Sequence, residues 1–510
     1  MKKLMVFLLL VVLLSAASFA GVREEIESQV KDINSTKLPW VAGVNQSFLD
    51  LEQMLWNNGM SVSYKDIVTK LNGYRDLLKE DTALKADNLT ANDDVYEASR
   101  FVYKYIGTPV PTSYIQIHTP VKNQLYHGTC WAFSATAAFE SALLVQRDKL
   151  TGSSVTASPL ELEDTTYDLS EQYTSYHNID WDIYRDSIYA GYYTGKGTIQ
   201  LQDCNLDAGG NAYFSTFNLI RYGITTEEKM PYQFDRNGWV SWNAKDGWKE
   251  EIDKNSFFAA KTTYVPSAEY AKARGFNYET YIKSIKELLV KNGALMVSFA
   301  VPVDFNVYLG GIYVPSAVFG SYVDAGLSPY DGGHAVSLVG WADMAKIKTM
   351  FPTIVASDAT YIEWNNYEYK VGGVASKNQA TEFWIIKNSW GNNWGWHGYY
   401  LVPMITQAQY DAFDGNNASI EDWMIESRDI FSTILGEKAF YGIDDNLKVI
   451  DFNDDHLIND TDYALILGKV TESPKVYEEK YDISAVKDGV IDYDDLEMFF
   501  IISSIMSSFK

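Results

Sequence analysis

The sequence predicts a fold of the α+β class, in which helical and strand segments occupy separate parts of the chain. An apolar helical run covers 131–145, and a second helical stripe covers 282–289. A buried strand is predicted directly afterwards, at 294–301, and a further apolar run of β type begins at His334. Both helices and strands are therefore expected in the core of the protein.

The composition is that of a globular protein with more than one domain. The chain has 510 residues, of which 46% are hydrophobic and 15% aromatic. This length allows two or three domains, each with a sizeable core. The net charge of −25 argues against nucleic acid as a partner and favours solubility and the binding of cations.

The first 20 residues have the pattern of a secretory signal peptide. Lys2 and Lys3 form a basic start, residues 4–14 an apolar core, and residues 18–20 a cleavage site before Gly21. No later run of about 18 apolar residues predicts a membrane span. We therefore expect an exported protein, located in the extracellular space, at the cell surface or in the periplasm.

Cys130 has the setting of a reactive thiol. It follows a turn and opens the first helical run, where the positive end of the backbone dipole favours a thiolate. Gln124 offers a side-chain amide to a substrate oxygen that becomes negative during attack. The alternative is a buried structural cysteine. The only other cysteine is Cys204, so no disulfide framework is expected.

Gln124 and the run Cys-Trp-Ala-Phe-Ser at 130–134 resemble the signature of the papain-like, or cathepsin-like, cysteine peptidases. The resemblance implies a two-lobed α+β fold, in which a cleft separates a helical lobe with Cys130 from a β lobe. Papain relatives usually carry a cysteine three residues before the nucleophile, bridged to one just before a Gly-Gly pair. His127 and Asp207 stand at those two positions, so that bridge is not expected here.

Two later motifs match the other catalytic residues of the family. His334 opens a His-Ala-Val-x-x-Val-Gly-Trp pattern, and Asn388 lies in a Lys-Asn-Ser-Trp-Gly block. The resemblance implies that His334 is the base for Cys130 and later protonates the leaving amine. It also implies that Asn388 orients the imidazole, while Trp390 shields that hydrogen bond from water. Gly333 replaces the Asn or Asp that the family often has, which leaves the specificity pocket open.

Gly209 and Gly210 resemble the Gly-Gly pair beside which, in this family, substrate backbone lies as an additional strand. A side chain at these positions would block that approach. Two segments, near 173–203 and 342–381, exceed the compact family core. We expect them to be surface insertions near the cleft, because loops tolerate added length.

The segment 21–107 resembles a pro-region. Apolar residues recur at helical spacing over 22–33. Ile-Asn at 33–34 and Trp-x-Ala-Gly at 40–43 resemble the propeptide of cathepsin B-type members. Such a segment would cover the cleft until it is cut, and the proline-rich linker at 108–112 is the expected neighbourhood of that cut. The alternative is an ordinary N-terminal helical subdomain.

The acidic C-terminal end is predicted to hold two calcium loops, each followed by a helix. Two such loops resemble the dockerin domain, which implies a cohesin-like scaffold partner. His456 in place of glycine, and the additional residues Val486 and Lys487, depart from that pattern. The alternative is an acidic, solvated helical tail. The expected ligands are Asp451, Asn453, Asp455, Leu457, Asn459 and Asp462 in the first loop, and Asp482, Ser484, Asp488, Val490, Asp492 and Asp495 in the second.

The predicted order is a signal peptide at 1–20, a pro-region at 21–107, a papain-like peptidase domain at 108–402, an extension at 403–440 and a dockerin-like module at 441–510. The predicted function is that of a secreted cysteine endopeptidase, made as a zymogen, that hydrolyses proteins or peptides without a cofactor for catalysis. The alternatives are an exopeptidase, a catalytically silent papain-shaped binding protein, and a scaffold-docked interaction protein.

Overall fold

In the computed structural model of the protein, the predicted signal peptide at 1–20 and most of the predicted insertion at 173–203 lie outside the described residues. The described residues are 23–35, 37–74, 110–147, 152, 158–176, 209–210, 212, 215, 219, 223–234, 236, 257–259, 261–265, 277–350, 364–368, 370–371, 374–375, 380–412, 430–434, 440–441, 452–453, 460–473, 476–481, 490–492, 495–496 and 499.

The centre of the molecule is a seven-stranded sheet whose paired strands are antiparallel. Its long central strand is β7 (Tyr330–Asp343), which begins four residues before His334. The order is β11 (Tyr399–Pro403), β10 (Glu382–Lys387), β7, β5 (Leu295–Pro302), β12 (Ile430–Ile434) and β4 (Lys261–Val265), with β2 (Tyr114–Ile115) also paired to β7. Strand β12 lies in the predicted extension at 403–440, so part of that extension belongs to the sheet.

Helix α7 (Cys130–Arg147) packs against β7 and β5, with α8 (Glu171–Tyr176) beside it. Nearly every residue of α7 from Cys130 to Leu144 is buried, because the helix is covered on several sides. Its first turn closes on Thr129, whose carbonyl oxygen accepts from the N–H groups of Ala132 and Phe133. The predicted helix therefore begins at the cysteine itself.

Helix α13 (Tyr278–Asn292) contacts α7 and the sheet, and it confirms the helix predicted over 282–289. Asn277 caps its start by accepting from the N–H of Thr280 at 2.8 Å. Gly293, with φ of 105°, ends it, as expected of a glycine after a helix. Strand β5 follows at once, and most of its residues are buried.

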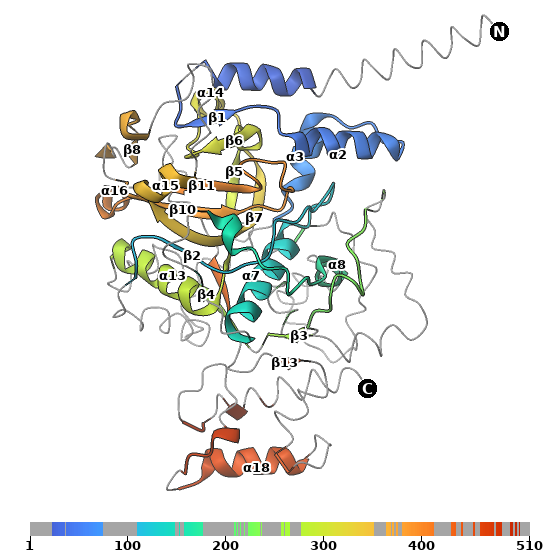
Figure 1. Ribbon diagram of the computed structural model, residues 1–510, viewed down its shortest axis with the longest axis vertical. Helices are drawn as coiled ribbons and strands as arrows, with labels where there is room; N and C mark the ends of the chain where they lie inside the picture. The colour runs from blue at the N-terminus through green and yellow to red at the C-terminus, as the bar shows by residue number, and fades with distance from the viewer. Residues whose placement is uncertain are drawn as a thin grey trace, which may run out of the picture.

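The N-terminal segment folds against the sheet-bearing part as a separate group of elements. A helix over 23–33 precedes β1 (Trp40–Ala42), α2 (Gln46–Asn57) and α3 (Tyr64–Leu71). Figure 1 shows these elements, in blue, gathered at one end of the molecule near β6 (Tyr308–Gly311) and away from α13. Strand β1 pairs antiparallel with β6, and Trp40 donates its indole N–H to the carbonyl oxygen of Val314 at 2.8 Å.

The predicted insertion at 342–381 contains regular structure that packs on the sheet. Trp364 is 6% exposed, and its ring lies edge-on to that of Phe383 at 5.3 Å. The remaining short elements are η1 (Pro159–Leu162), β3 (Phe257–Phe258), η3 (Phe305–Val307), α14 (Ala317–Asp324), α15 (Met344–Met350), η4 (Trp364–Asn366), β8 (Lys370–Val371), β9 (Val374–Ala375), α16 (Gln407–Ala412), β13 (Phe440–Tyr441), α18 (Asp460–Thr471) and η6 (Glu479–Tyr481).

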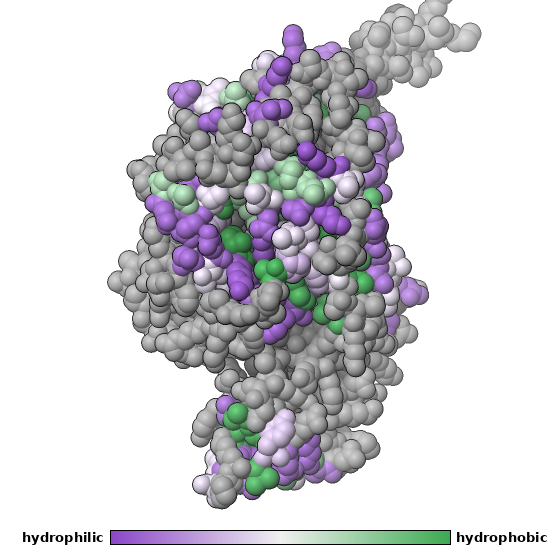
Figure 2. All heavy atoms as spheres, turned by 60° about the vertical axis from the view of Figure 1, so that its left-hand side comes forward, coloured by the Kyte–Doolittle hydropathy of each residue, from purple (hydrophilic) through white to green (hydrophobic). Residues whose placement is uncertain are grey.

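One face of the described part carries mainly polar side chains (Figure 2). Figure 2 shows a face on which hydrophilic side chains predominate and apolar ones form small, separate groups. Scattered apolar residues of this kind are normal for a globular protein. Among the described helices, none has both the length and the hydropathy that a membrane span requires.

Candidate active site

Cys130 is completely buried at the first position of α7 and is a free thiol. Burial raises its pKa to about 12, although the backbone N–H groups of Ala335, Gly73 and Trp131 act in the opposite direction. The helix start does supply the amide groups that were expected to favour a thiolate. In this structure desolvation outweighs them, so the thiol is protonated at neutral pH.

His334 lies in β7 with its ring between those of Trp390 and Phe299, at centroid distances of 4.6 and 5.8 Å. Its Nε2 is 2.7 Å from Oδ1 of Asn388, the residue after β10. An amide oxygen only accepts, so Nε2 carries the proton and Nδ1 is left with a lone pair. Among the described residues Nδ1 has no hydrogen bond of good geometry.

Burial also lowers the pKa of His334 to about 4, against the effects of Asn388 and of the Leu71 carbonyl group, which favour the charged ring. Cys130 and His334 are therefore both neutral near pH 7 in this structure. The strand pairing explains why Asn388 reaches the histidine, because Lys387 at the end of β10 lies opposite Ser337 of β7.

Gln124 is fully buried, and its side-chain amide is held at both ends. Nε2 donates to the carbonyl oxygens of Leu71 at 3.0 Å and His127 at 2.8 Å. At the other end of the amide, Oε1 accepts from the hydroxyl group of Ser389 at 2.7 Å. This hydrogen bond fixes which end of the amide faces the Leu71 carbonyl.

The segment 71–74 of the N-terminal region runs across these residues as an extended peptide. The N–H of Gly210 donates to the carbonyl oxygen of Gly73 at 3.0 Å, and the N–H of Tyr74 donates to that of Gly333 at 2.9 Å. A Cβ atom on Gly210 would lie 2.5 Å from the Trp131 ring, which excludes a side chain there. Gly209, with φ of 73°, has a backbone conformation that favours glycine.

The structure thus brings together the residues that the sequence singled out in four distant places. Cys130, Gln124, Gly210, His334 and Asn388 all border the segment 71–74 or its neighbours. Trp390 is 1% exposed and its ring lies tilted by 33° against that of His334, so here it contacts the ring that Asn388 holds.

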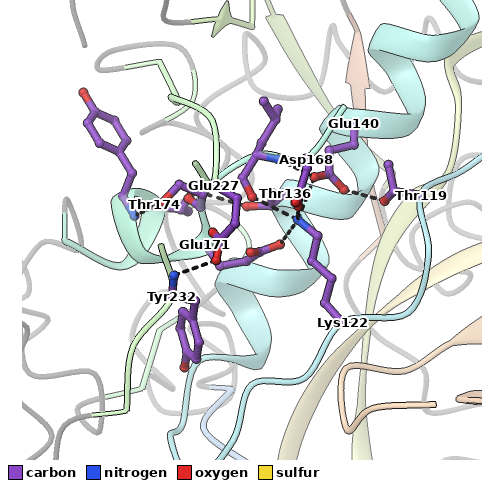
Figure 3. A network of polar contacts seen from close by, with 12 residues as sticks. Thr119, Lys122, Thr136, Glu140, Asp168, Glu171, Thr174, Glu227 and Tyr232 are labelled. Atoms are coloured by element: carbon purple, nitrogen blue, oxygen red, sulfur yellow. Dashed lines mark hydrogen bonds and ion pairs between the residues drawn. The ribbon is translucent and has the colours of Figure 1, made fainter. Parts of the chain in front are cut away.

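A charged cluster around Lys122, in which Glu140 and Glu171 are buried, was not predicted from the sequence. Lys122 lies 2.8 Å from Glu140 of α7 and 2.9 Å from both Asp168 and Glu171. Figure 3 shows its ammonium group reaching between α7 and α8, where Glu140 also accepts from the hydroxyl group of Thr119. The sequence signal that could have indicated this cluster was two glutamates among apolar neighbours, because buried carboxylates need a partner of opposite charge or a hydrogen-bond donor.

The C-terminal ligand sets are only partly described. Asp451, Asp455, Leu457, Asn459, Asp482, Ser484 and Asp488 lie outside the described residues. Of the others, the buried carboxylates of Asp462 and Asp495 accept from the backbone N–H groups of Phe452 and Asp492, each at 2.8 Å. In the described part of the chain, no three His, Cys, Asp or Glu residues form a metal-binding group.

Comparisons with known proteins identify the family that the chain resembles. The profile described as "Papain family cysteine protease" matches residues 112–165 and 196–420. Cysteine proteinase 2 of Zea mays is 25% identical over 295 residues, which cover 56% of this chain and 53% of that protein. Pro-cathepsin H of Bos taurus is 24% identical over 288 residues, which cover 56% of each protein. The chain spans about half the length of the curated relatives it matches.

Solved structures of precursor forms are similar as well. The proform of the ragweed pollen allergen Amb a 11, a cysteine protease, is 17% identical with a TM-score of 0.44, covering 82% of this chain and 89% of that one. Digestive procathepsin L 3 of Tenebrio molitor is 16% identical with a TM-score of 0.38, covering 81% and 90%.

Proposed function

We propose, since the chain belongs to the papain family of cysteine proteases, that it is a cysteine endopeptidase made as a precursor that its own N-terminal segment inhibits. The observation that carries this proposal is the peptide backbone already present in the site. Leu71 presents its carbonyl oxygen to the Gln124 amide, while Gly73 and Tyr74 pair with Gly210 and Gly333.

The chemistry follows from the atoms at hand. His334 Nδ1 removes the proton of the Cys130 thiol, and the sulfur attacks the carbonyl carbon of the substrate. Gln124 Nε2 and the backbone N–H of Cys130 donate to the oxygen as it becomes negative. The amine leaves with the proton from His334, and a water molecule, deprotonated by the same ring, then hydrolyses the thioester. Asn388 Oδ1 holds the Nε2–H throughout.

Inhibition of the precursor has two physical components. The segment 71–74 occupies the place of a substrate, and a Cβ atom on Gly73 would collide with the backbone of Gly128, so the fit is close. The same segment excludes water from Cys130 and His334, which keeps both groups neutral. Removal of 21–107 would expose the pair to water and permit the thiolate and imidazolium forms.

Incubation of the purified precursor at mildly acidic and neutral pH, beside Cys130→Ala, tests the proposal. We expect the wild type to shorten near residues 107–112 and to react with a thiol-directed epoxide, whereas Cys130→Ala does neither. Mass spectrometry reports both results. A wild type that remains unlabelled and inactive, even after another protease has trimmed it, would instead favour the catalytically silent binding protein.

We further propose that the protein is exported through the segment 1–20 and that the module at 441–510 binds calcium and docks onto a cohesin-like scaffold. The support is the loop spacing and the placement of Asp462 at the start of α18, with one oxygen on the Phe452 N–H. We expect calcium at about 100 times its Kd to stabilise the module by about 2.7 kcal/mol. Calorimetry of the full chain that detects neither bound calcium nor a raised melting temperature would contradict this.

A further inference from the structure

We propose that Tyr232 is a positioning residue for catalysis, because its hydroxyl group holds the loop 124–130 that carries the Gln124 amide to Cys130. This inference rests on the proposed peptidase function. The phenolic O–H donates to the carbonyl oxygen of Gln124 at 3.0 Å. The hydroxyl group of Thr129 lies 2.6 Å from the same phenolic oxygen. One side chain thus connects the two ends of the loop.

The loop needs such support because its backbone is strained. Leu125 has φ of 52°, which is a left-handed conformation at a residue with a bulky side chain. Such a conformation costs about 1–2 kcal/mol and persists only where neighbouring groups impose it. Asn123 accepts from the N–H of Leu125 at 2.9 Å, and Tyr232 donates to the Gln124 carbonyl oxygen of the same peptide group.

The backbone and the ring of Tyr232 are themselves held by neighbouring residues. Its N–H donates to a carboxylate oxygen of Glu227 at 2.6 Å. Figure 3 shows its phenol directed away from the carboxylates of the charged cluster. The ring lies edge-on to Phe133 of α7, with centroids 4.8 Å apart. The hydroxyl group is therefore held by the part of the protein that also holds Cys130.

Aromatic contacts surround one of the two positions at which the family resemblance places a disulfide bridge. His127, at the position of the family's bridged cysteine, is 1% exposed and stacks on Phe234 at 5.3 Å with an interplanar angle of 29°. Tyr232 contacts the same imidazole edge-on at 6.3 Å. The segment 231–234 thus packs on the loop at both of these residues, and Tyr232 supplies the hydrogen bonds.

The sharpest variant is Tyr232→Phe, which keeps the ring and removes the two hydrogen bonds. Tyr322→Phe is the matched control, because Tyr322 lies in α14 and is 38% exposed. In activated protein prepared from the full chain, we expect kcat for a peptide substrate to fall about tenfold in Tyr232→Phe, with KM within about twofold. The rate at which iodoacetamide alkylates Cys130 should stay unchanged, since that reaction develops no oxyanion.

Hydrogen exchange in the precursor gives a readout that needs no activity. We expect the amides of residues 125–129 to exchange about tenfold faster in Tyr232→Phe than in Tyr322→Phe. Unchanged exchange and unchanged kcat would overturn the proposal. Equal losses in hydrolysis and alkylation would also overturn it, because they would indicate general damage to the site. If Tyr232→Phe exchanges faster as expected but the wild type hydrolyses no peptide, the peptidase function is refuted. The catalytic part of this inference is then refuted with it.

Thr129→Val tests the other end of the connection. If both hydroxyl groups act through one bridge, the double variant Thr129→Val/Tyr232→Phe should hydrolyse peptides no more slowly than Tyr232→Phe alone. Losses that multiply in the double variant would show independent roles and would contradict the bridge.

Discussion

At the scale of single residues, the precursor depends on the protonation states of Cys130 and His334. Burial raises the pKa of Cys130 from 9 to about 12 and lowers that of His334 to about 4. Each pKa unit changes the thiolate fraction tenfold, so this fraction at pH 7 falls about a thousandfold. We therefore expect iodoacetamide to alkylate Cys130 in the precursor at a rate that increases about tenfold per pH unit between pH 6 and 9.

The activated protein should behave differently, with a rate that is nearly independent of pH over the same range, because the thiolate is then paired with an imidazolium. Peptide mapping assigns the label to Cys130, and Cys130→Ser is the control. Steric protection alone would slow alkylation without changing its pH dependence. A rate in the precursor that does not change with pH would thus contradict a neutral thiol.

At the scale of elements, α7, α13 and β5 could be predicted from local sequence signals. Such signals mark where an element begins or ends. Gly293 ends α13, for example, and Cys130 opens α7 after a turn. The sequence also indicated the residues now found around Asn388, since short motifs fix local geometry. It did not reveal the bridge by Tyr232 or the partners of Lys122, because these depend on the packing of distant segments.

The protonation state of Cys130 also depends on the packing of distant segments, so the local sequence did not predict it. A helix start predicts a favoured thiolate, yet burial of the side chain raises the pKa of Cys130, even though the backbone N–H of Gly73 acts in the opposite direction. No pattern near Cys130 could report a contact with residues about sixty positions earlier. The pKa of this thiol therefore depends on packing by segments that are distant in the sequence, such as Ala335 and Gly73.

At the scale of the whole molecule, the cluster around Lys122 joins segments that surround the site, and it should make stability depend on pH. Three carboxylates surround one ammonium group, so one of them is favoured in its protonated form. Burial raises the pKa of Glu171 from 4.5 to about 8; Lys122 opposes this shift, and Glu140 and Glu227 add to it. Between these values the folded protein keeps a proton that the unfolded chain has released. Stability contributed by this group is therefore present below about pH 4.5 and is lost as pH rises towards 8.

Glu171→Gln mimics the protonated side chain and should remove this part of the pH dependence. We expect its melting temperature to equal that of the wild type near pH 4.5 and to exceed it at pH 8, by roughly 2–4 °C for each kcal/mol gained. Glu161→Gln, at an exposed position of η1, is the control for the loss of one negative charge from a chain of net charge −25. A melting temperature of Glu171→Gln that falls with pH as steeply as that of the control would show that Glu171 is ionised in the folded protein. Lys122 would then hold all of its carboxylates as charged partners, and the slope would come from the net charge alone.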